Sequence, residues 1–542
     1  MNEAPTEATD PNPVLSENIS YVRKTGQRYC ICIVCDFFYP RLGGVELHQY
    51  QLAQELIARG HRVIIVTGVY GNRYERQGVR YLPSGLKVYY CVRASVHNQV
   101  TFPTLLTFLP QFRRICIKEK VDIVHGHQTT STMAHECLLL AAAMGIRTVF
   151  TDHSLFGFAN LGAIHVNKLM QFTLSHISHV ICVSHTLREN LALRARINPR
   201  LISAIPNALD ATKFRPDPSR APNALERVNV IVISRLAYRK GIDIVVDILP
   251  RICAAYPTVH FIIGGEGPKR HRLEAVCKAH ELTDRVQLLG EVAHADVRGV
   301  LTQGHIFLNC SLTESFCIAI LEAAACGLHV VATRVGGVPE VLPPSFVEFA
   351  EPEADSVAVA LARAIEMVIA REQEFQSRHS PAASALSSHG ARSNTSNHSQ
   401  ESVSAETSSQ QAAVQELKSV DQVIDERQTV PHPATAHEQQ AYSRYEAVKR
   451  MYNWSDVAWR TNIVYDSVML QARPHTFLRM VRSYASHGPV SSFVFSFVAA
   501  LALICVWILD KLDPSSRLEP EIELSWEEME EQIVKEAEAN QN

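Results

Sequence analysis

Short apolar runs recur along this chain in two series, and that repetition restricts the fold more than any other feature. The first series has runs at residues 29–35, 62–67, 87–91, 121–125, 147–151, 179–184 and 201–206. The second series has runs at residues 228–234, 259–265, 285–290, 305–310 and 329–334. Segments with helical periodicity lie between the runs. Val- and Ile-rich runs that alternate with helices indicate parallel strands covered on both faces, so the sequence predicts an α/β fold with two doubly wound sheets.

The two series also predict the domain boundaries. A chain of 542 residues is too long for one hydrophobic core. Residues 210–227, between the two series, are rich in proline and charged side chains, which is typical of a linker. We therefore expect an N-terminal domain at 28–208 and a C-terminal domain at 209–370. Ligands of doubly wound folds bind beyond the carboxyl ends of the strands, which predicts a cleft between the domains.

Composition changes outside these domains. Residues 1–27 are polar, and residues 371–441 are rich in Ser, Gln, His and Ala without a sustained period, so we expect a disordered leader and a disordered insertion. Helical periodicity returns at 442–470. The chain carries 52 basic and 55 acidic side chains, and that balance argues against a general nucleic-acid binder. Its 13 cysteines are scattered, mostly in apolar runs, which favours buried reduced thiols over a disulfide framework.

Residues 490–509 form a stretch of 20 uncharged residues. As a helix this stretch reaches about 30 Å, the thickness of the hydrocarbon core of a membrane. A fully buried helix of a soluble protein is the alternative. The basic residues Arg473, Arg479 and Arg482 precede the stretch and an acidic tail follows it. Because basic residues favour the cytosolic side, we expect cytosolic N-terminal domains and a short tail, 510–542, across the membrane.

Two glycines follow the first predicted strand. Gly43 and Gly44 precede a segment with helical periodicity. Glycines at the start of a helix let backbone N–H groups approach an anion at the positive end of the helix dipole. A plain turn between a strand and a helix explains the pair equally well.

Two cations follow the first strand of the second series. Arg235 comes directly after this strand, and Lys240 follows five residues later. Arg binds two oxygens at once and Lys acts as a point charge, so this pair in a cleft suits a diphosphate. The alternative is a pair of surface cations.

Two glutamates eight residues apart form the most informative segment. Glu314 is predicted at the start of a helix, and Glu322 lies inside that helix. Carboxylates bind sugar and ribose hydroxyls well because each oxygen accepts hydrogen bonds. Glu314 could instead be a first-turn partner of the helix dipole. Glu322 has apolar neighbours, so its carboxylate needs a partner.

Histidines gather at the ends of predicted strands. His125 and His127 follow one strand, and His153 follows the next. Zinc is conceivable, but no acidic ligand is placed beside them. Structural histidines or substrate contacts explain the cluster better, so the sequence predicts no metal.

Several of these motifs occur together in one known order. They are Gly43-Gly44-Val45, HGHQ at 125–128, SRLAYRKG at 234–241, GGEGP at 264–268, the two glutamates and GGVPE at 336–340. In this order the chain resembles retaining glycosyltransferases of the GT-B type, which have two Rossmann-like domains facing a cleft. The blocks FFYPRLGGVE, HGHQTTS, TDHSLFGF and SLTESFCIAILEAA, with one C-terminal span, narrow the resemblance to one family. It is the family of catalytic subunits of phosphatidylinositol N-acetylglucosaminyltransferase, which begin the synthesis of glycosylphosphatidylinositol (GPI) anchors.

This resemblance implies a role for each candidate residue. Arg235 and Lys240 would bind the diphosphate of the donor, UDP-N-acetylglucosamine. Glu322 would hold the ribose hydroxyls and Glu314 those of the transferred sugar. His127 would lie near that sugar.

The resemblance also implies the setting of the reaction. Gly43 and Gly44 would let the diphosphate and the acceptor approach the backbone. The departing phosphate would take the proton of the acceptor, phosphatidylinositol, without a metal ion. The resemblance further implies other subunits of a membrane complex, and the endoplasmic reticulum as the location.

Three alternatives remain at this stage. The same fold could use another nucleotide sugar or lipid acceptor. The chain could be an inactive scaffold, although it keeps both cations and both glutamates. A nicotinamide-dependent dehydrogenase would explain GGEGP but not the lack of a G-x-G-x-x-G motif at the first strand. The acceptor contacts are not identified, since the basic stretch 102–120 could bind anionic lipid but is better explained as a helix facing the core.

Overall fold

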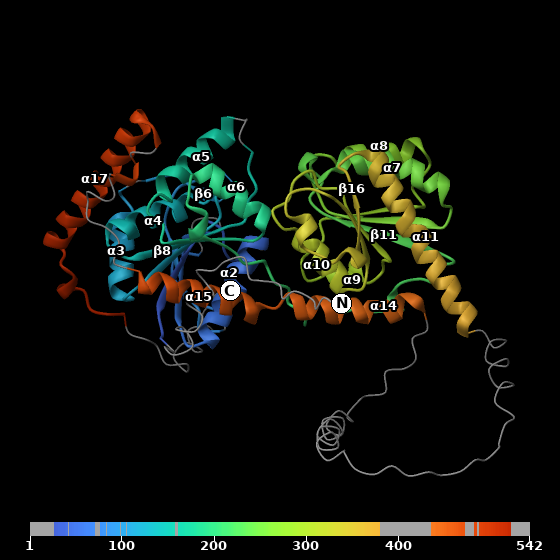
Figure 1. Cartoon of the computed structure of the whole chain (residues 1–542), viewed down its shortest axis with the longest axis horizontal. Coiled ribbons are helices and arrows are strands. Elements are labelled where there is room, and N and C mark those ends of the chain that lie inside the picture. The colour runs from blue at the N-terminus through green and yellow to red at the C-terminus, as the bar shows by residue number, and fades with distance from the viewer. Residues whose placement is uncertain are drawn as a thin grey trace, which may run out of the picture.

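The computed structural model describes residues 27–521, apart from residues 42, 71–75, 83, 98, 105, 158–160, 380–434, 472–481 and 485–486. The predicted leader, most of the predicted insertion and the end of the acidic tail therefore lie outside the described residues. Two α/β domains lie side by side, each with a central sheet and helices on both faces (Figure 1). Residues 371–379 and 436–441, which were expected to belong to the disordered insertion, are helical.

The sheet of the N-terminal domain has eight strands. Their spatial order is β10 (Ile202–Ala204), β9 (His179–Cys182), β8 (Arg147–Asp152), β7 (Ile123–His127), β1 (Cys30–Val34), β2 (Arg62–Gly68), β4 (Lys87–Cys91) and β3 (Gly78–Tyr81). All neighbours pair in parallel except β3, which pairs antiparallel with β4. The order reverses between β1 and β7, and that point defines where a ligand binds in such sheets. The helices of this domain are α2 (Gly44–Ala58), α3 (Leu109–Lys118), α4 (Thr132–Ala143), α5 (Leu161–Thr173) and α6 (His185–Ala195).

The sheet of the C-terminal domain has six parallel strands. Their order is β13 (Val286–Gly290), β12 (Val259–Gly264), β11 (Val228–Ile233), β14 (Ile306–Asn309), β15 (His329–Thr333) and β16 (Val347–Ala350). Here the order reverses between β11 and β14. The helices of this domain are α7 (Ile242–Ala255), α8 (Arg270–Ala279), α9 (Val297–Leu301), α10 (Ile318–Ala325) and α11 (Ala354–His379). The α/β fold with two doubly wound sheets is therefore confirmed.

Each predicted apolar run contains a strand, because continuous runs of Val and Ile are buried on both faces of a parallel sheet. All five residues of β1, for example, are buried. Strands β3 and β16 and the short hairpin of β5 (Ser95–His97) and β6 (Val100–Thr101) were not predicted. These strands lie at sheet edges or outside the two sheets. Their side chains are only partly apolar, so no continuous run marks them. All 13 cysteines are free and 12 of them are buried, as predicted.

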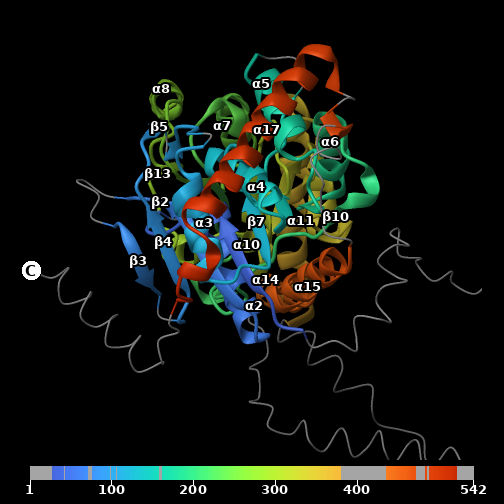
Figure 2. The ribbon, with the colours of Figure 1, turned by 90° about the vertical axis from the view of Figure 1, so that its left-hand side faces the viewer.

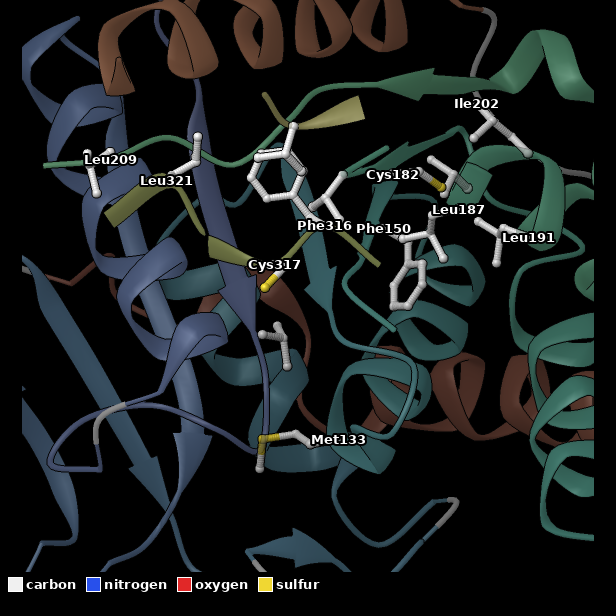
Figure 3. Close-up of a cluster of buried hydrophobic side chains, with 14 of the residues drawn as sticks. Met133, Phe150, Cys182, Leu187, Leu191, Ile202, Leu209, Phe316, Cys317 and Leu321 are labelled. Carbon is white, nitrogen blue, oxygen red and sulfur yellow. The ribbon is translucent and has the colours of Figure 1, made fainter. Parts of the chain in front are cut away.

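The last helices cross from the C-terminal domain back to the N-terminal domain. Helix α14 (Ala436–Met451) packs against α10 and α11, and α15 (Trp454–Leu470) packs against α2 (Figure 1). One buried apolar cluster also continues from Phe150 and Leu187 of the first domain to Phe316 and Leu321 of the second (Figure 3). The two domains are therefore joined both by covalent helices and by a shared apolar contact.

One helix is long and apolar enough to cross a membrane. Helix α17 (Pro489–Leu512) has a mean hydropathy of 2.6 and 17% of its most apolar window is buried. It lies across α4 (Figure 2), and Ala499, Ala502 and Val506 face the domain. Large apolar side chains face outward at helical spacing, namely Val490, Phe493, Val494, Phe497, Leu501, Ile504, Trp507 and Leu512. This exposed stripe fits association with a membrane.

The residues after α17 contact the N-terminal domain. Asp510 lies 2.7 Å from Arg113, and Asp513 lies 2.9 Å from Arg114. The backbone N–H of Glu521 donates to Lys118 at 3.1 Å. Both ends of α17 therefore lie on one domain, which differs from the tail across the membrane that the flanking charges predict. The same contacts settle the stretch 102–120, because α3 faces the core and Arg113 is 2% exposed.

A buried ion pair links β8 to α6. Arg194 donates to the Asp152 carboxylate at 2.7 Å, and both side chains are 0% exposed. Asp152 also accepts from the Thr129 hydroxyl at 2.5 Å. Removal of one partner leaves an uncompensated charge in the core.

We therefore predict that Arg194→Leu lowers the free energy of unfolding by about 3–5 kcal/mol. Thermal unfolding of the purified chain in detergent measures this loss. The exposed Arg200→Leu serves as the matched control and should unfold like the wild type. Equal unfolding temperatures for the two variants would contradict the prediction.

Candidate functional site

A cavity of about 630 Å³ lies between the two domains. Its walls come from both of them: His153, Ser154, Leu155, Phe156, Arg235, Ala237, Tyr238, Arg239, Lys240, Pro268, Thr313, Glu314 and Ser315. It lies beyond the carboxyl ends of β8, β11 and β14, where ligands of such sheets bind. A second cavity, of about 530 Å³, lies at the opposite ends of β1 and β2. The interdomain cavity is therefore the candidate site.

The structure brings three predicted residues together in this cavity. Arg235 follows β11, and Lys240 ends the short 3-10 helix η4 (Tyr238–Lys240). Gly241 follows it with a φ of 67°, and a Cβ there would lie 1.7 Å from the carbonyl oxygen of Cys310. Only glycine fits such an approach, so this residue lets the Lys240 turn pack on the end of β14.

Lys240 and Glu314 form an ion pair inside the cavity. Glu314 also accepts a hydrogen bond from the Ser311 hydroxyl at 2.8 Å. Burial alone would lower the pKa of Lys240, but the charge of Glu314 holds this pKa above its ordinary value. Lys240 therefore remains a cation that can bind an anionic ligand.

The prediction that Glu314 starts a helix is wrong. Helix α10 begins at Ile318, and Glu314 lies in the loop before it. Its carboxylate therefore pairs with Lys240 and does not act on the helix dipole. The loop is packed closely, because a Cβ on Gly336 would lie 2.0 Å from the carbonyl oxygen of Glu314. The GGVPE segment thus supports the backbone that carries this glutamate.

Glu322 lies within α10, as predicted, and is 8% exposed. It does not line the cavity with the other three residues. Its partner is His294, whose Nε2 lies 3.6 Å from the Glu322 carboxylate. The hydrogen bond with Glu322 raises the pKa of His294. His294 was not among the predicted residues, although the need for a partner to Glu322 was the signal that could have found it.

The glycines of the first domain are placed differently from the cations. Gly43 precedes α2 and Gly44 is its first residue. A Cβ on Gly43 would lie 2.6 Å from the carboxylate of Glu46 in the first turn of the same helix. Neither glycine lines the interdomain cavity. The positive end of α2 therefore faces the chain's own carboxylate in this structure.

The four histidines of the N-terminal wall differ in their bonding. His125 is satisfied, since its ring bonds to the Tyr465 and Thr151 hydroxyls at 2.7 Å each. His127 is 0% exposed, and its Nε2 has no hydrogen-bond partner among the described residues. His153 reaches the cavity, and the ring of His48 on α2 lies against it. Burial lowers the pKa of His48 to about 4 and that of His125 to about 3, so both rings are neutral.

One nitrogen from each of His48, His127 and His153 lies within 4.8 Å of the other two. These are the described side chains that could hold a metal ion. His48 was not among the predicted candidates, because helical periodicity does not show that α2 turns this residue toward the ends of β7 and β8.

Three hydrogen bonds to one segment close the cleft at its rim. The Ser184 hydroxyl donates to the carbonyl of Ser315 at 2.7 Å, and the Ser315 hydroxyl donates to the carbonyl of His153 at 2.6 Å. The Glu340 carboxylate accepts from the backbone N–H groups of His185 and Thr186 at 2.6 and 2.8 Å. Glu340 thus caps α6 across the domain boundary, where a negative charge is favoured.

Comparison with known proteins agrees with this geometry. The sequence profile of the family described as PIGA (GPI anchor biosynthesis) matches residues 71–160, and that of glycosyl transferases group 1 matches residues 216–384. Sucrose-phosphate synthase from Thermosynechococcus elongatus has the same fold, with a TM-score of 0.59 and 18% identity over 81% of this chain and 99% of its own. Anabaena HepE in complex with UDP-glucose aligns with a TM-score of 0.52 and 15% identity over 81% and 100%. The chain is therefore a glycosyltransferase with two Rossmann-like domains.

Relatives of higher identity define the family. The phosphatidylinositol N-acetylglucosaminyltransferase subunit of this type from Homo sapiens is 44% identical over 91% of this chain and 87% of its own length. Its counterpart of the same name in Arabidopsis thaliana is 41% identical over 90% and 93%. The chain belongs to this PIGA family of phosphatidylinositol N-acetylglucosaminyltransferase subunits.

The neutral histidines make stability depend on pH. His125 has a folded pKa of about 3, whereas an unfolded histidine titrates near 6.5. Below about pH 6.5 the unfolded state binds a proton that the folded state does not, so stability falls as pH falls.

We predict that His125→Gln, although less stable at pH 7, loses less stability between pH 6.5 and pH 5 than the wild type. The difference in slope should approach about 1.4 kcal/mol per pH unit. Denaturant unfolding at a series of pH values measures it, and parallel curves for the two proteins would contradict the assignment of a neutral buried His125.

Proposed function

We propose that this chain transfers N-acetylglucosamine from UDP-N-acetylglucosamine to phosphatidylinositol with retention of configuration, the first step of GPI-anchor synthesis. The observation that carries this proposal is the convergence of Arg235, Lys240 and Glu314 in one interdomain cavity. The family of the chain supplies the reaction. The proposed donor and acceptor follow the printed names of the relatives.

The cations suit the departing diphosphate. Arg235 and Lys240 stand on neighbouring turns after β11, so both can reach one diphosphate. Donor binding would exchange the bond between Lys240 and Glu314 for a bond between Lys240 and a phosphate oxygen. This exchange frees the Glu314 carboxylate to accept hydrogen bonds from hydroxyls of the transferred sugar. Fixed charges in a cleft that excludes water stabilise the negative charge that develops on UDP.

Glu322 and His127 complete the proposed donor site. Glu322 would bind the ribose hydroxyls after it separates from His294. His127 would contact the sugar from the N-terminal wall, and the backbone at Gly43 and Gly44 would lie beside the diphosphate and the acceptor.

The transfer itself needs one bond formed and one broken. The acceptor oxygen bonds to C1 of the sugar, the bond from C1 to the phosphate oxygen breaks, and the acceptor proton moves to that departing oxygen. The residues of the chain hold the two reactants in position and stabilise charge, which accounts for much of the barrier reduction. Arg235 and Lys240 would neutralise the diphosphate, with no metal ion bound to it.

We predict that Glu314→Ala reduces transfer by about 100-fold or more, because it removes a contact to the reacting sugar. Membranes from cells that lack the native enzyme, carrying wild type or variant, would receive radiolabelled UDP-N-acetylglucosamine. The wild type should yield a labelled lipid that phosphatidylinositol-specific phospholipase C cleaves, and NMR of the product should show the retained anomer. Glu353→Gln, an exposed carboxylate, is the matched control and should remain active.

The same assay tests the second candidate, a related transferase with another nucleotide sugar or lipid acceptor. Label from a different donor, or a labelled lipid that resists the phospholipase, would support it. Failure to bind UDP would instead indicate a scaffold without catalysis.

We also propose that α17 anchors the chain in the membrane of the endoplasmic reticulum, with the catalytic domains on the cytosolic side, beside other subunits of a complex. The basic residues before α17 and its uncharged length support a single span. A span would separate Asp510 from Arg113 by the thickness of the membrane.

This orientation predicts that a glycosylation sequon engineered near residue 530 becomes modified in cells. A sequon placed in the exposed turn near Asp217, within the catalytic part, is the control and should stay unmodified. An unmodified tail would instead support the arrangement in which Asp510 and Asp513 remain bonded to α3.

A further inference from the structure

Three histidines meet in the N-terminal wall of the cleft, although they lie far apart in sequence. His48 is on α2, His127 ends β7, and His153 follows β8. The ring centroids of His48 and His153 are 4.7 Å apart, and that of His127 lies 5.6 Å from each of them. Imidazole is the commonest ligand of transition metals in proteins, and it suits zinc well.

The hydrogen bonds of these rings leave three nitrogens able to bind an ion. His48 Nδ1 lies 2.9 Å from the amide oxygen of Asn207. Because that oxygen only accepts, Nδ1 carries the hydrogen and Nε2 keeps its lone pair. Metal-binding histidines are oriented by partners of this kind.

The other two rings bond only to each other among the described residues, through His127 Nδ1 and His153 Nε2. No partner holds the second nitrogen of His127, so its hydrogen can reside on Nε2 and leave Nδ1 free to act as a ligand. Replacement of this single contact by a shared ion would break no other hydrogen bond.

The spacing of this pair matches a tetrahedral site. His127 Nδ1 and His153 Nε2 are 3.3 Å apart, which is long for a hydrogen bond to nitrogen. Two nitrogens that bind one tetrahedral zinc ion at about 2.0–2.1 Å lie roughly 3.4 Å apart. His153 also lines the interdomain cavity. The fourth position of the ion would therefore face the cleft and hold water, as in open three-histidine zinc sites.

We propose that His48, His127 and His153 form a binding site for a divalent zinc-like ion in the N-terminal wall of the cleft. The site is separate from the diphosphate contacts of Arg235 and Lys240, and it does not depend on the proposed acceptor. An ion there would occupy the wall that faces Glu314 and would exclude a sugar from it. Zinc is therefore expected to inhibit the transfer reaction.

Cobalt binding tests the proposal directly. The full chain, purified in detergent without a polyhistidine tag and treated with a chelator, would be titrated with Co²⁺ while visible absorption is recorded. We expect one equivalent to give the strong bands of tetrahedral cobalt without a thiolate band, and Zn²⁺ to remove them. His48→Asn and His153→Asn should each weaken binding by about 100-fold or more, and Asn207→Ala by about 10-fold.

His271→Asn is the matched control, since His271 is exposed on α8 and should not affect the cobalt spectrum. Binding of UDP to each variant shows that the C-terminal domain remains folded, and circular dichroism checks the whole chain. Only weak octahedral absorption, or tetrahedral bands that persist in folded His48→Asn and His153→Asn, would overturn the proposal. Zinc inhibition that equals the wild type in folded His48→Asn would overturn the expected effect on transfer.

Discussion

All strands of a parallel sheet end on the same side, and the cleft follows from that constraint. In both domains the strand order reverses beside the first strand of the series, β1 in one sheet and β11 in the other. The loops beyond those strands diverge at the reversal and leave space for side chains. Arg235 and Glu314 come from strands on either side of such a reversal. An ion pair between Lys240 and Glu314 then holds the two loops at a fixed distance until a ligand replaces it.

The closed rim depends on backbone groups as much as on side chains. Ser184 and Ser315 each donate to a carbonyl of the opposite domain, and Glu340 binds the first N–H groups of α6. These acceptors and donors belong to turns that the two sheets position independently. Closure therefore requires both sheets to be correctly formed, and it couples the GGVPE segment to the loop that carries Glu314.

The sequence predicted the strands well because each is marked by a continuous apolar run, which depends on local composition alone. It predicted Arg235, Lys240 and Glu314 as neighbours because strand ends converge. The start of α10 was misplaced, since Cys317, with a φ of 71°, interrupts a segment whose composition suits a helix. His48 and His294 escaped detection because their importance depends on what lies across a domain or a loop. The contacts of the tail with α3 arise between residues about 400 apart, beyond the reach of any periodicity.

The last part of the fold has a consequence for how the chain can vary. The carboxylate of Glu372, near the end of α11, accepts a hydrogen bond at 3.1 Å from the backbone N–H of Ala436, the first residue of α14. The residues that leave α11 thus return to almost the same point in space. Each doubling of the connecting length costs only about 0.6 kcal/mol of closure entropy. Insertions and deletions between these helices can accumulate in related chains while the cleft, and the helices that brace it, keep their geometry.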